Sequence, residues 1–244
     1  MGLSEDGYAV FAPTAAGQLW AAAARRAAIR VSACPAMRAC NLRHGETWFV
    51  GVDALPNAPD GSVDGVPLVG DWQAHVPPMT MHSAQVSIIY PGYPGRDVDE
   101  AQSAHRYRRL RHAAHVDGLL PVGRHRRRYA QEFHAYILGL PLNRSKHAPT
   151  VVWPGSHTIM QGALRAAIGD APPASVDVTE AYQAARRVVF ARCAPVSLRV
   201  APGGAFLLHR FALHGTAPWD GPVGPARMIA FLRPEFDTAT AWLA

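Results

Sequence analysis

The 244-residue sequence has few cysteines, no long hydrophobic run and no basic leader at its N-terminus. Its three cysteines, Cys34, Cys40 and Cys193, lack the spacing of a zinc ribbon or a disulfide framework. No stretch approaches the roughly 18 uninterrupted apolar residues of a membrane-spanning helix. The segment from Met1 to Asp6 carries acidic side chains, whereas a signal peptide begins with basic ones. We therefore expect a cytoplasmic protein with reduced thiols and no membrane segment.

Internal repeats and low-complexity linkers are also absent from the sequence. Hydrophobic residues make up 49% and charged residues 17% of the chain, so it can bury a substantial core. All-β barrels of this length commonly form a single unit, and we expect one domain over residues 1–244. The formal charge of +6 permits an anionic partner without identifying one.

Short apolar runs separated by turn residues predict mostly strands. The expected strands span residues 47–53, 84–90, 132–142, 150–157, 195–200, 204–215 and 226–236. Turns are expected over 54–68, and an exposed strand or loop over 106–118. Helices are expected over 14–30, over 156–169 with Ser156 as its N-cap, and over 177–193. Many short strands with few helices predict a β-sandwich or barrel.

His115 and Asp117 form an H-x-D pair, and residues two apart in an extended segment point to the same side. Their imidazole and carboxylate can therefore converge on one metal ion, with a third ligand from elsewhere. Two histidines and one carboxylate leave three positions open on an octahedral ion, as Fe(II) oxygenases require. Such a pair also occurs by chance in surface loops, but here His214 leaves a hydrophobic strand and Arg227 begins another.

Four blocks follow one another over roughly residues 110–233: HVDG, TVVWPGSH, FLLHRFALHGTAPW and ARMIAFLRP. Together they resemble the phytanoyl-CoA dioxygenase family of 2-oxoglutarate-dependent oxygenases. The resemblance implies a mainly β fold with flanking helices, a double-stranded β-helix or cupin-like jelly roll. The barrel core would span about 46–236, with helical support over about 1–45. His115, Asp117 and His214 would be the catalytic ligands of Fe(II), and 2-oxoglutarate the co-substrate.

The resemblance also implies a binding site for the co-substrate. Arg227 would pair with the distal carboxylate of 2-oxoglutarate, which a guanidinium meets with two parallel hydrogen bonds. Thr216 would offer a hydroxyl to the same carboxylate. Gln85, Ser87 and Tyr90 would supply further polar contacts, although Tyr90 equally fits a barrel aromatic before a Pro-Gly turn.

Other histidines compete with these ligands. His209 lies five residues before His214, and on one continuous strand the two would face opposite sides. The LHGT context favours His214. His112, His134 and His157 are expected to be structural, with His157 shaping a turn between a strand and a helix.

Two arginine tracts flank the H-x-D pair, namely Arg106, Arg108, Arg109 and Arg111, then Arg124, Arg126, Arg127 and Arg128. They indicate either a solvated face or a positive rim that attracts an anionic or carrier-linked substrate. Aromatic residues between them are sparse, which disfavours a nucleic-acid partner.

The expected reaction is oxidation, typically hydroxylation, of an unactivated C–H bond in a small-molecule substrate by molecular oxygen. One alternative is a cupin-type metalloenzyme that does not use 2-oxoglutarate. The other is a basic, non-enzymatic module that binds polyanions.

Overall fold

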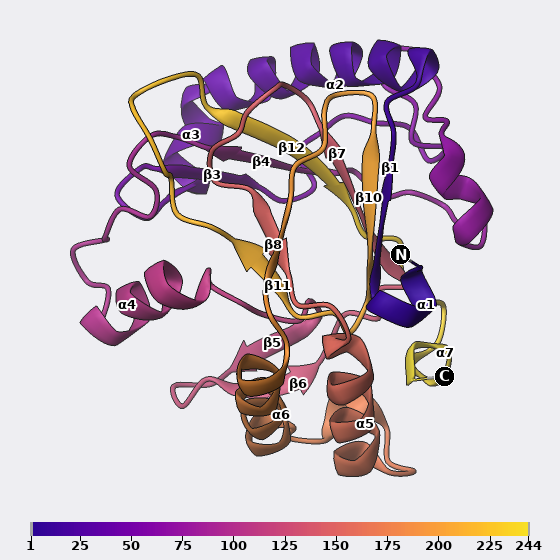
Figure 1. Cartoon of the computed structure of the whole chain (residues 1–244), viewed down its shortest axis with the longest axis vertical. Helices are drawn as coiled ribbons and strands as arrows, with labels where there is room; N and C mark the ends of the chain where they lie inside the picture. Colours follow the sequence, from indigo (N-terminus) through magenta and orange to yellow (C-terminus); the bar gives the residue numbers. More distant parts are fainter. Residues whose placement is uncertain (1, 244) are drawn as a thin grey trace.

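The structure, a computed structural model that describes residues 2–243, consists mainly of antiparallel sheets with flanking helices, as expected (Figure 1). The large sheet has seven strands in the order β1-β10-β7-β12-β4-β3-β2. They are β1 (Tyr8–Phe11), β10 (Ala205–His209), β7 (Tyr136–Pro141), β12 (Arg227–Leu232), β4 (Gln85–Ile89), β3 (Trp48–Gly51) and β2 (Leu42–Arg43). The small sheet contains β11 (His214–Thr216), β8 (Thr150–Val152) and β9 (Val196–Leu198). A hairpin of β5 (Leu119–Val122) and β6 (Arg127–Ala130) lies beside them.

The alternation of side chains along the strands divides the core. Phe206 and Leu208 of β10 face inward, where they pack against Val152 of the small sheet. Leu207, between them, faces outward into a different cluster. This two-residue period is the physical basis of the strand predictions from the sequence.

Helix α2 (Ala15–Ala33) covers the outer face of the large sheet and confirms the helix expected over 14–30 (Figure 1). The Thr14 side chain caps it by accepting a hydrogen bond from the backbone N–H of Gly17 at 3.0 Å. Its buried face is largely alanine, which allows the helix to approach the sheet closely. Helix α3 (Pro35–Asn41) follows it, and α1 (Leu3–Asp6) precedes β1.

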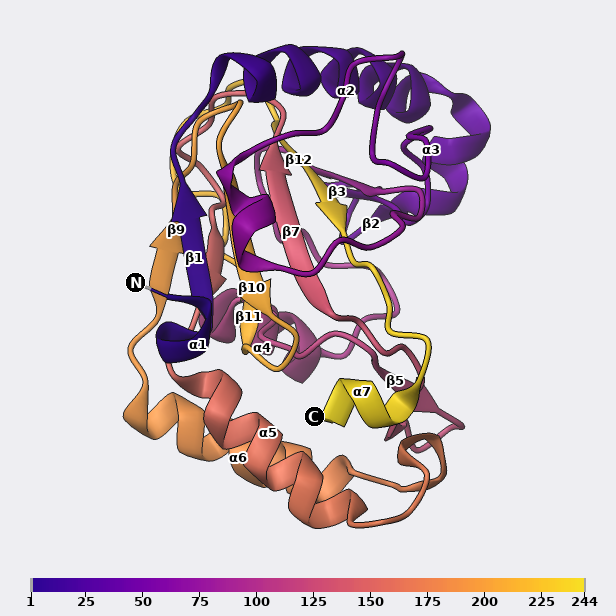
Figure 2. The same ribbon diagram turned by 90° about the vertical axis from the view of Figure 1, so that its right-hand side faces the viewer.

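Helices α5 (Ser156–Ile168) and α6 (Thr179–Arg192) run side by side beneath the sheets (Figure 2). They bury an apolar cluster with Val116 and Leu213, the residues next to the candidate metal ligands. The short helix α7 (Ala239–Leu243) adds Trp242 to this cluster. Two 3-10 turns, Asp71–His75 and Pro173–Ser175, complete the structure over the described residues.

Three sequence predictions are corrected. Residues 106–111, expected to form an exposed strand or loop, belong to helix α4 (Gln102–Arg111). Glutamine, alanine, arginine and leucine all favour a helix, and the Tyr107 ring packs against Phe190 of α6. The strand expected over 204–215 is two strands, β10 and β11, separated by a turn at 210–213. The N-terminal support is not wholly helical, because β1 joins the large sheet through β10.

The start of α5 also differs from the prediction. Gly155, in a left-handed conformation with φ of 76°, is the N-cap, and Ser156 is the first helical residue. The Ser156 hydroxyl instead accepts a hydrogen bond from the backbone N–H of Leu213 at 2.9 Å. The PGSH block therefore holds the segment that leads into His214.

The described residues contain neither a disulfide bond nor a helix that could span a membrane. Cys34, Cys40 and Cys193 are all free. No helix within residues 2–243 is long and apolar enough to cross a membrane.

Candidate metal centre

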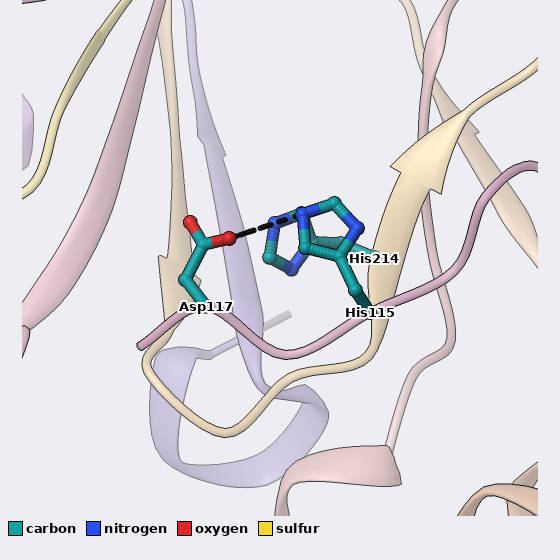
Figure 3. A group of neighbouring side chains, drawn as sticks. All are labelled: His115, Asp117 and His214. Atoms are coloured by element: carbon teal, nitrogen blue, oxygen red, sulfur yellow. Dashed lines mark ion pairs between the residues drawn. The ribbon is translucent and has the colours of Figure 1, made fainter. Parts of the chain in front are cut away.

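His115 and His214 are brought together by a pair of backbone hydrogen bonds. The N–H of His115 donates to the carbonyl of His214 at 2.8 Å, and the N–H of His214 donates to the carbonyl of His115 at 3.0 Å. Residues paired in this way project their side chains to the same side of the sheet. Asp117 lies two residues further along the same extended segment, so its carboxylate faces the same point (Figure 3).

The three side chains offer ligand atoms that all lie within 4.8 Å of one another. Nε2 of His115 is 3.0 Å from Oδ1 of Asp117, and Nε2 of His214 is 3.7 Å from the same oxygen. Each imidazole is oriented by its other nitrogen, since Nδ1 of His115 lies 2.9 Å from the carbonyl of Ala113 and Nδ1 of His214 lies 2.9 Å from that of Ala212. With Nδ1 directed to a backbone carbonyl, Nε2 is the ring atom that each histidine can offer to a metal ion.

The charges of the group suit a cation. Burial lowers the pKa of His214 to about 4, so this ring is neutral at neutral pH. Burial would raise the pKa of Asp117, but the charge of Arg233 and the contacts with His214 and His115 outweigh it and hold this pKa well below its usual range. Burial likewise opposes a proton on His115, but the hydrogen bond to Asp117 outweighs it and the pKa of His115 is raised. An ionised carboxylate beside two imidazoles is the donor set of a non-haem Fe(II) site.

The glycine of the LHGT motif, Gly215, is required by a close backbone contact. A Cβ at this position would lie 2.1 Å from the backbone carbonyl oxygen of His112. The same carbonyl accepts a hydrogen bond from the N–H of Thr216 at 2.9 Å. Glycine therefore allows the segment that leads to His115 to approach β11 closely enough to pair with it.

Arg233 is a residue of the site that no motif in the sequence indicates. Its Nε donates to Oδ2 of Asp117 at 2.5 Å, and a second guanidinium nitrogen donates to Oε1 of Gln85 at 2.9 Å. Gln85, expected to contact the co-substrate, is therefore linked to the metal group through Arg233. Arg233 lies within the ARMIAFLRP block, but only the folded chain brings it to Asp117.

Arg227 lies deep in the barrel, with 4% of its surface exposed. Its guanidinium donates to the Thr150 hydroxyl at 2.9 Å and to the Ser87 hydroxyl at 3.4 Å. Its Nε has no hydrogen-bond partner, and no carboxylate of the described chain pairs with it. Burial lowers the pKa of Arg227 to about 10, so the group remains charged at neutral pH.

Of the two other residues expected at the co-substrate site, Thr216 and Tyr90, only Thr216 lines the cavity. Thr216 lies opposite Thr150 in the small sheet and lines the cavity. Tyr90 does not reach the cavity, because it packs with Val86 and Ile88 on the outer face of the sheet. The barrel aromatic is therefore the description that fits Tyr90. Tyr93, which we did not select, is buried near Arg227, and its hydroxyl has no hydrogen-bond partner within residues 2–243.

His209 does not belong to the His115, Asp117 and His214 group, and a turn separates it from His214 where the sequence predicts one continuous strand. Its ring packs against that of His157, with centroids 4.9 Å apart, and its Nδ1 accepts a hydrogen bond from the N–H of Phe211. His157 lies close to the carbonyl of Ser4, with 3.2 Å between Nε2 and the oxygen. His112 ends α4 in a left-handed conformation.

A second group of possible ligands, His44, Asp97 and Glu100, is less suited to a metal. Asp97 already accepts hydrogen bonds from the backbone N–H groups of His44 and Gly45. Arg108 forms an ion pair with Glu100 and so places a competing cation there.

The His115, Asp117 and His214 group opens into a cavity of about 800 Å³. Its wall includes both hydroxyls that hold Arg227, those of Ser87 and Thr150. Among the described residues that line it, none belongs to either arginine tract. The tracts lie on α4 and around the β5–β6 hairpin, and Arg127 pairs there with Asp177 and Glu180.

No protein-family model matches the sequence, and no curated protein matches it. Solved structures match over almost the whole chain. The non-heme alpha ketoglutarate dependent carbocyclase SnoK from nogalamycin biosynthesis is similar with a TM-score of 0.58 at 15% identity, covering 98% of this chain and 86% of SnoK. EctD from S. alaskensis, solved with 2-oxoglutarate and 5-hydroxyectoine, gives 0.51 at 18% identity and covers 95% and 72%. The epimerase SnoN gives 0.50 at 13% identity and covers 96% and 80%.

Identities this low establish the fold alone. The chain thus has the cupin-like jelly-roll fold of these non-heme 2-oxoglutarate-dependent enzymes, with a His-Asp-His group that could bind iron.

Proposed function

We propose that this protein is an Fe(II)- and 2-oxoglutarate-dependent dioxygenase that hydroxylates, or otherwise oxidises, an unactivated C–H bond of a small organic substrate. One observation carries the proposal: the His115, Asp117 and His214 group shares a cavity wall with the hydroxyls that hold the buried Arg227. The motifs quoted above support the phytanoyl-CoA dioxygenase family as its branch. One domain over residues 1–244 and a cytoplasmic location belong to the same proposal.

The residues present fit both absent groups. Two imidazoles that direct their Nε2 atoms to one ionised carboxylate fit Fe(II). Arg227 fits the distal carboxylate of 2-oxoglutarate, because a buried guanidinium without an acidic partner gains from a carboxylate that it can bind with two hydrogen bonds. Thr216, which lines the cavity opposite Thr150, would offer its hydroxyl to the same carboxylate.

When both groups are bound, iron and 2-oxoglutarate supply the oxidising chemistry, with dioxygen divided between succinate and the oxidised substrate as CO₂ is released. The residues of the chain would hold the metal ion and orient the co-substrate and the substrate. His115, Asp117 and His214 would hold the metal and leave positions open for the other reactants. Arg227 would orient the co-substrate. Val50, Met81 and Phe231 give the cavity apolar walls against which a substrate can pack.

Anaerobic titration with Fe(II) and then 2-oxoglutarate tests the proposal. The wild-type protein should develop the weak visible charge-transfer band of the chelate. The Arg227→Ala variant should still bind Fe(II) but should bind 2-oxoglutarate roughly 100-fold more weakly, since a buried charged partner is lost. Arg30→Ala, which removes an exposed arginine paired with Asp64, is the matched control. Absence of the band in wild-type protein that holds iron would show the proposal to be wrong.

The same variant separates the alternatives. A cupin-type metalloenzyme without 2-oxoglutarate would keep its activity in Arg227→Ala. A polyanion-binding module would bind DNA or RNA with a steep salt dependence and would be indifferent to His115→Ala. That module has weak support, because Arg108 and Arg127 form ion pairs within the protein and Arg128 donates to the Leu119 carbonyl.

A further inference from the structure

We propose that the substrate carries a protonated amine, recognised at the mouth of the cavity by the carboxylates of Asp53, Glu132 and Glu235. The inference rests on the proposed function, because it names the class of molecule that would be presented to the iron. It replaces the anionic substrate that the arginine tracts had indicated.

The three carboxylates come from separate segments that converge on the cavity. Asp53 lies in the turn after β3, with φ of 51°. The backbone N–H of Glu132 points to the carbonyl of Gly118, next to the metal ligand Asp117. Glu235 follows β12 and pairs through its backbone with His134. Their side chains are 66%, 41% and 48% exposed, so a ligand can reach all three.

None of these carboxylates has an arginine or lysine partner within the described chain. Asp53 lies 3.2 Å from His82, Glu132 lies 3.1 Å from His134, and Glu235 lies 3.7 Å from the other nitrogen of His134. The chain has 24 lysines and arginines, and carboxylates elsewhere do pair with them. Examples are Asp64 with Arg30, Glu100 with Arg108, and Asp177 with Arg127. The mouth of the cavity is therefore an acidic region on a basic protein.

No arginine or lysine among the described residues that line the cavity neutralises these three carboxylates. Arg233 is the only arginine or lysine among the described lining residues, and it is already matched by Asp117. The hydrogen bond from His134 lowers the pKa of Glu132, so this carboxylate is ionised at neutral pH.

A second observation points to a ligand. His134 is 5% exposed and lines the cavity, yet its Nδ1 has no hydrogen-bond partner within residues 2–243. A protonated amine has three N–H donors, which can meet carboxylate oxygens and this imidazole nitrogen, 3.7 Å from Glu235, together. The same cavity is also lined by apolar side chains, those of Trp48, Val50, Val52, Met81 and Phe231. The substrate that fits has an apolar body and a cationic end.

Matched probes on three scaffolds test the inference by calorimetry: tryptamine, phenylbutylamine and octylamine, each compared with its N-acetyl derivative and with the carboxylic acid of the same length. Both metal-free protein and anaerobic protein loaded with Fe(II) and 2-oxoglutarate are titrated. On at least one scaffold the amine should bind at least tenfold more tightly than its neutral and acidic counterparts. This preference should fall as salt rises, because the carboxylates are partly exposed.

The variant Asp53→Asn/Glu132→Gln/Glu235→Gln should abolish the preference, with a loss of up to roughly fivefold for each partly exposed carboxylate. The control Asp71→Asn/Asp99→Asn/Asp170→Asn removes the same charge from exposed positions outside the cavity and should leave the preference unchanged. Equal binding of amine, amide and acid on every scaffold, or no binding of any amine, would overturn the inference. So would an equal loss in the control variant.

The charge-transfer band, recorded on the same samples, separates the two proposals. A normal band without an amine preference overturns the inference and leaves the proposed function intact. An amine preference in iron-loaded protein that shows no band overturns the proposed function and leaves the cation site standing.

Discussion

Arg233 and Asp117 form a direct ion pair, with Nε of the guanidinium 2.5 Å from Oδ2 of the carboxylate. The other carboxylate oxygen, Oδ1, is the one that faces both imidazoles. Arg233 is itself held by Gln85. One oxygen of Asp117 is thus engaged by Arg233, and the other faces the two imidazoles of the candidate metal centre.

Replacing Arg233 should therefore weaken metal binding without removing a ligand. We expect Arg233→Gln to lower Fe(II) affinity roughly tenfold, because loss of a group that orients a ligand typically costs 10- to 100-fold. Arg233→Lys should recover only part of the loss, since an ammonium cannot hold Asp117 and Gln85 together. Titration with Fe(II) or Co(II) under anaerobic conditions measures this. Unchanged affinity in Arg233→Gln would mean that Asp117 needs no such support.

Thr150 and Thr216 face each other across the small sheet, but only Thr150 bonds Arg227. Thr150→Val should reduce the free energy of unfolding by about 1–3 kcal/mol, because a buried donor of Arg227 loses its partner. Thr216→Val should leave stability almost unchanged and should weaken 2-oxoglutarate binding if its hydroxyl contacts the co-substrate. Denaturant unfolding and 2-oxoglutarate titration of both variants separate the two roles. A stability loss in Thr216→Val as large as that in Thr150→Val would contradict this division.

Gly215 should not tolerate a side chain. Gly215→Ala places a methyl group against the His112 carbonyl, and we expect a loss of about 1–3 kcal/mol in stability together with weaker Fe(II) binding. Gly162→Ala is the matched control, because nothing lies within 4 Å of a Cβ there and the residue is helical. Thermal unfolding and metal titration of both variants measure this. Wild-type iron affinity in Gly215→Ala would show that the backbone pairing of His115 with His214 is not required.

His209 should make the metal-free protein sensitive to acid. Burial lowers the pKa of His209 to about 3, whereas an unfolded histidine titrates near 6.5. Below about pH 6.5 the unfolded state therefore binds one more proton, so stability falls with pH until His209 is protonated in the folded state near pH 3. In His209→Asn, whose side-chain oxygen can still accept the Phe211 N–H, the slope of stability against pH should be smaller by roughly one proton.

Urea unfolding of both proteins between pH 4 and pH 7, with a chelator present, measures that slope. The metal ligands titrate equally in the two proteins, so only the difference between them reports on His209. Parallel curves would show that His209 is already protonated in the folded protein or is not buried.

Much of the site could be predicted from the sequence because its motifs are local. HVDG places an imidazole and a carboxylate two residues apart, and LHGT places a histidine before a glycine that a close backbone contact requires. The strands followed from the two-residue alternation of apolar side chains, and the helix after Thr14 followed from a cap and a helical period.

The remaining features depend on contacts between distant segments. The role of Arg233 arises only when the end of β12 meets Asp117, and that of Tyr93 only when its ring is buried near Arg227. The helix α4 was missed because its arginines give no apolar period to read. The argument that separated His209 from His214 assumes one continuous strand, whereas a turn at 210–213 lies between them.

The buried guanidinium of Arg227, which has no acidic partner in the described chain, also bears on the stability of the protein. A dicarboxylate that binds only the folded chain raises the free energy of unfolding, by about 2.7 kcal/mol at a hundred times its Kd. Because proteolysis acts on opened chains, the persistence of this protein in a cell would rise and fall with the supply of the oxo acid.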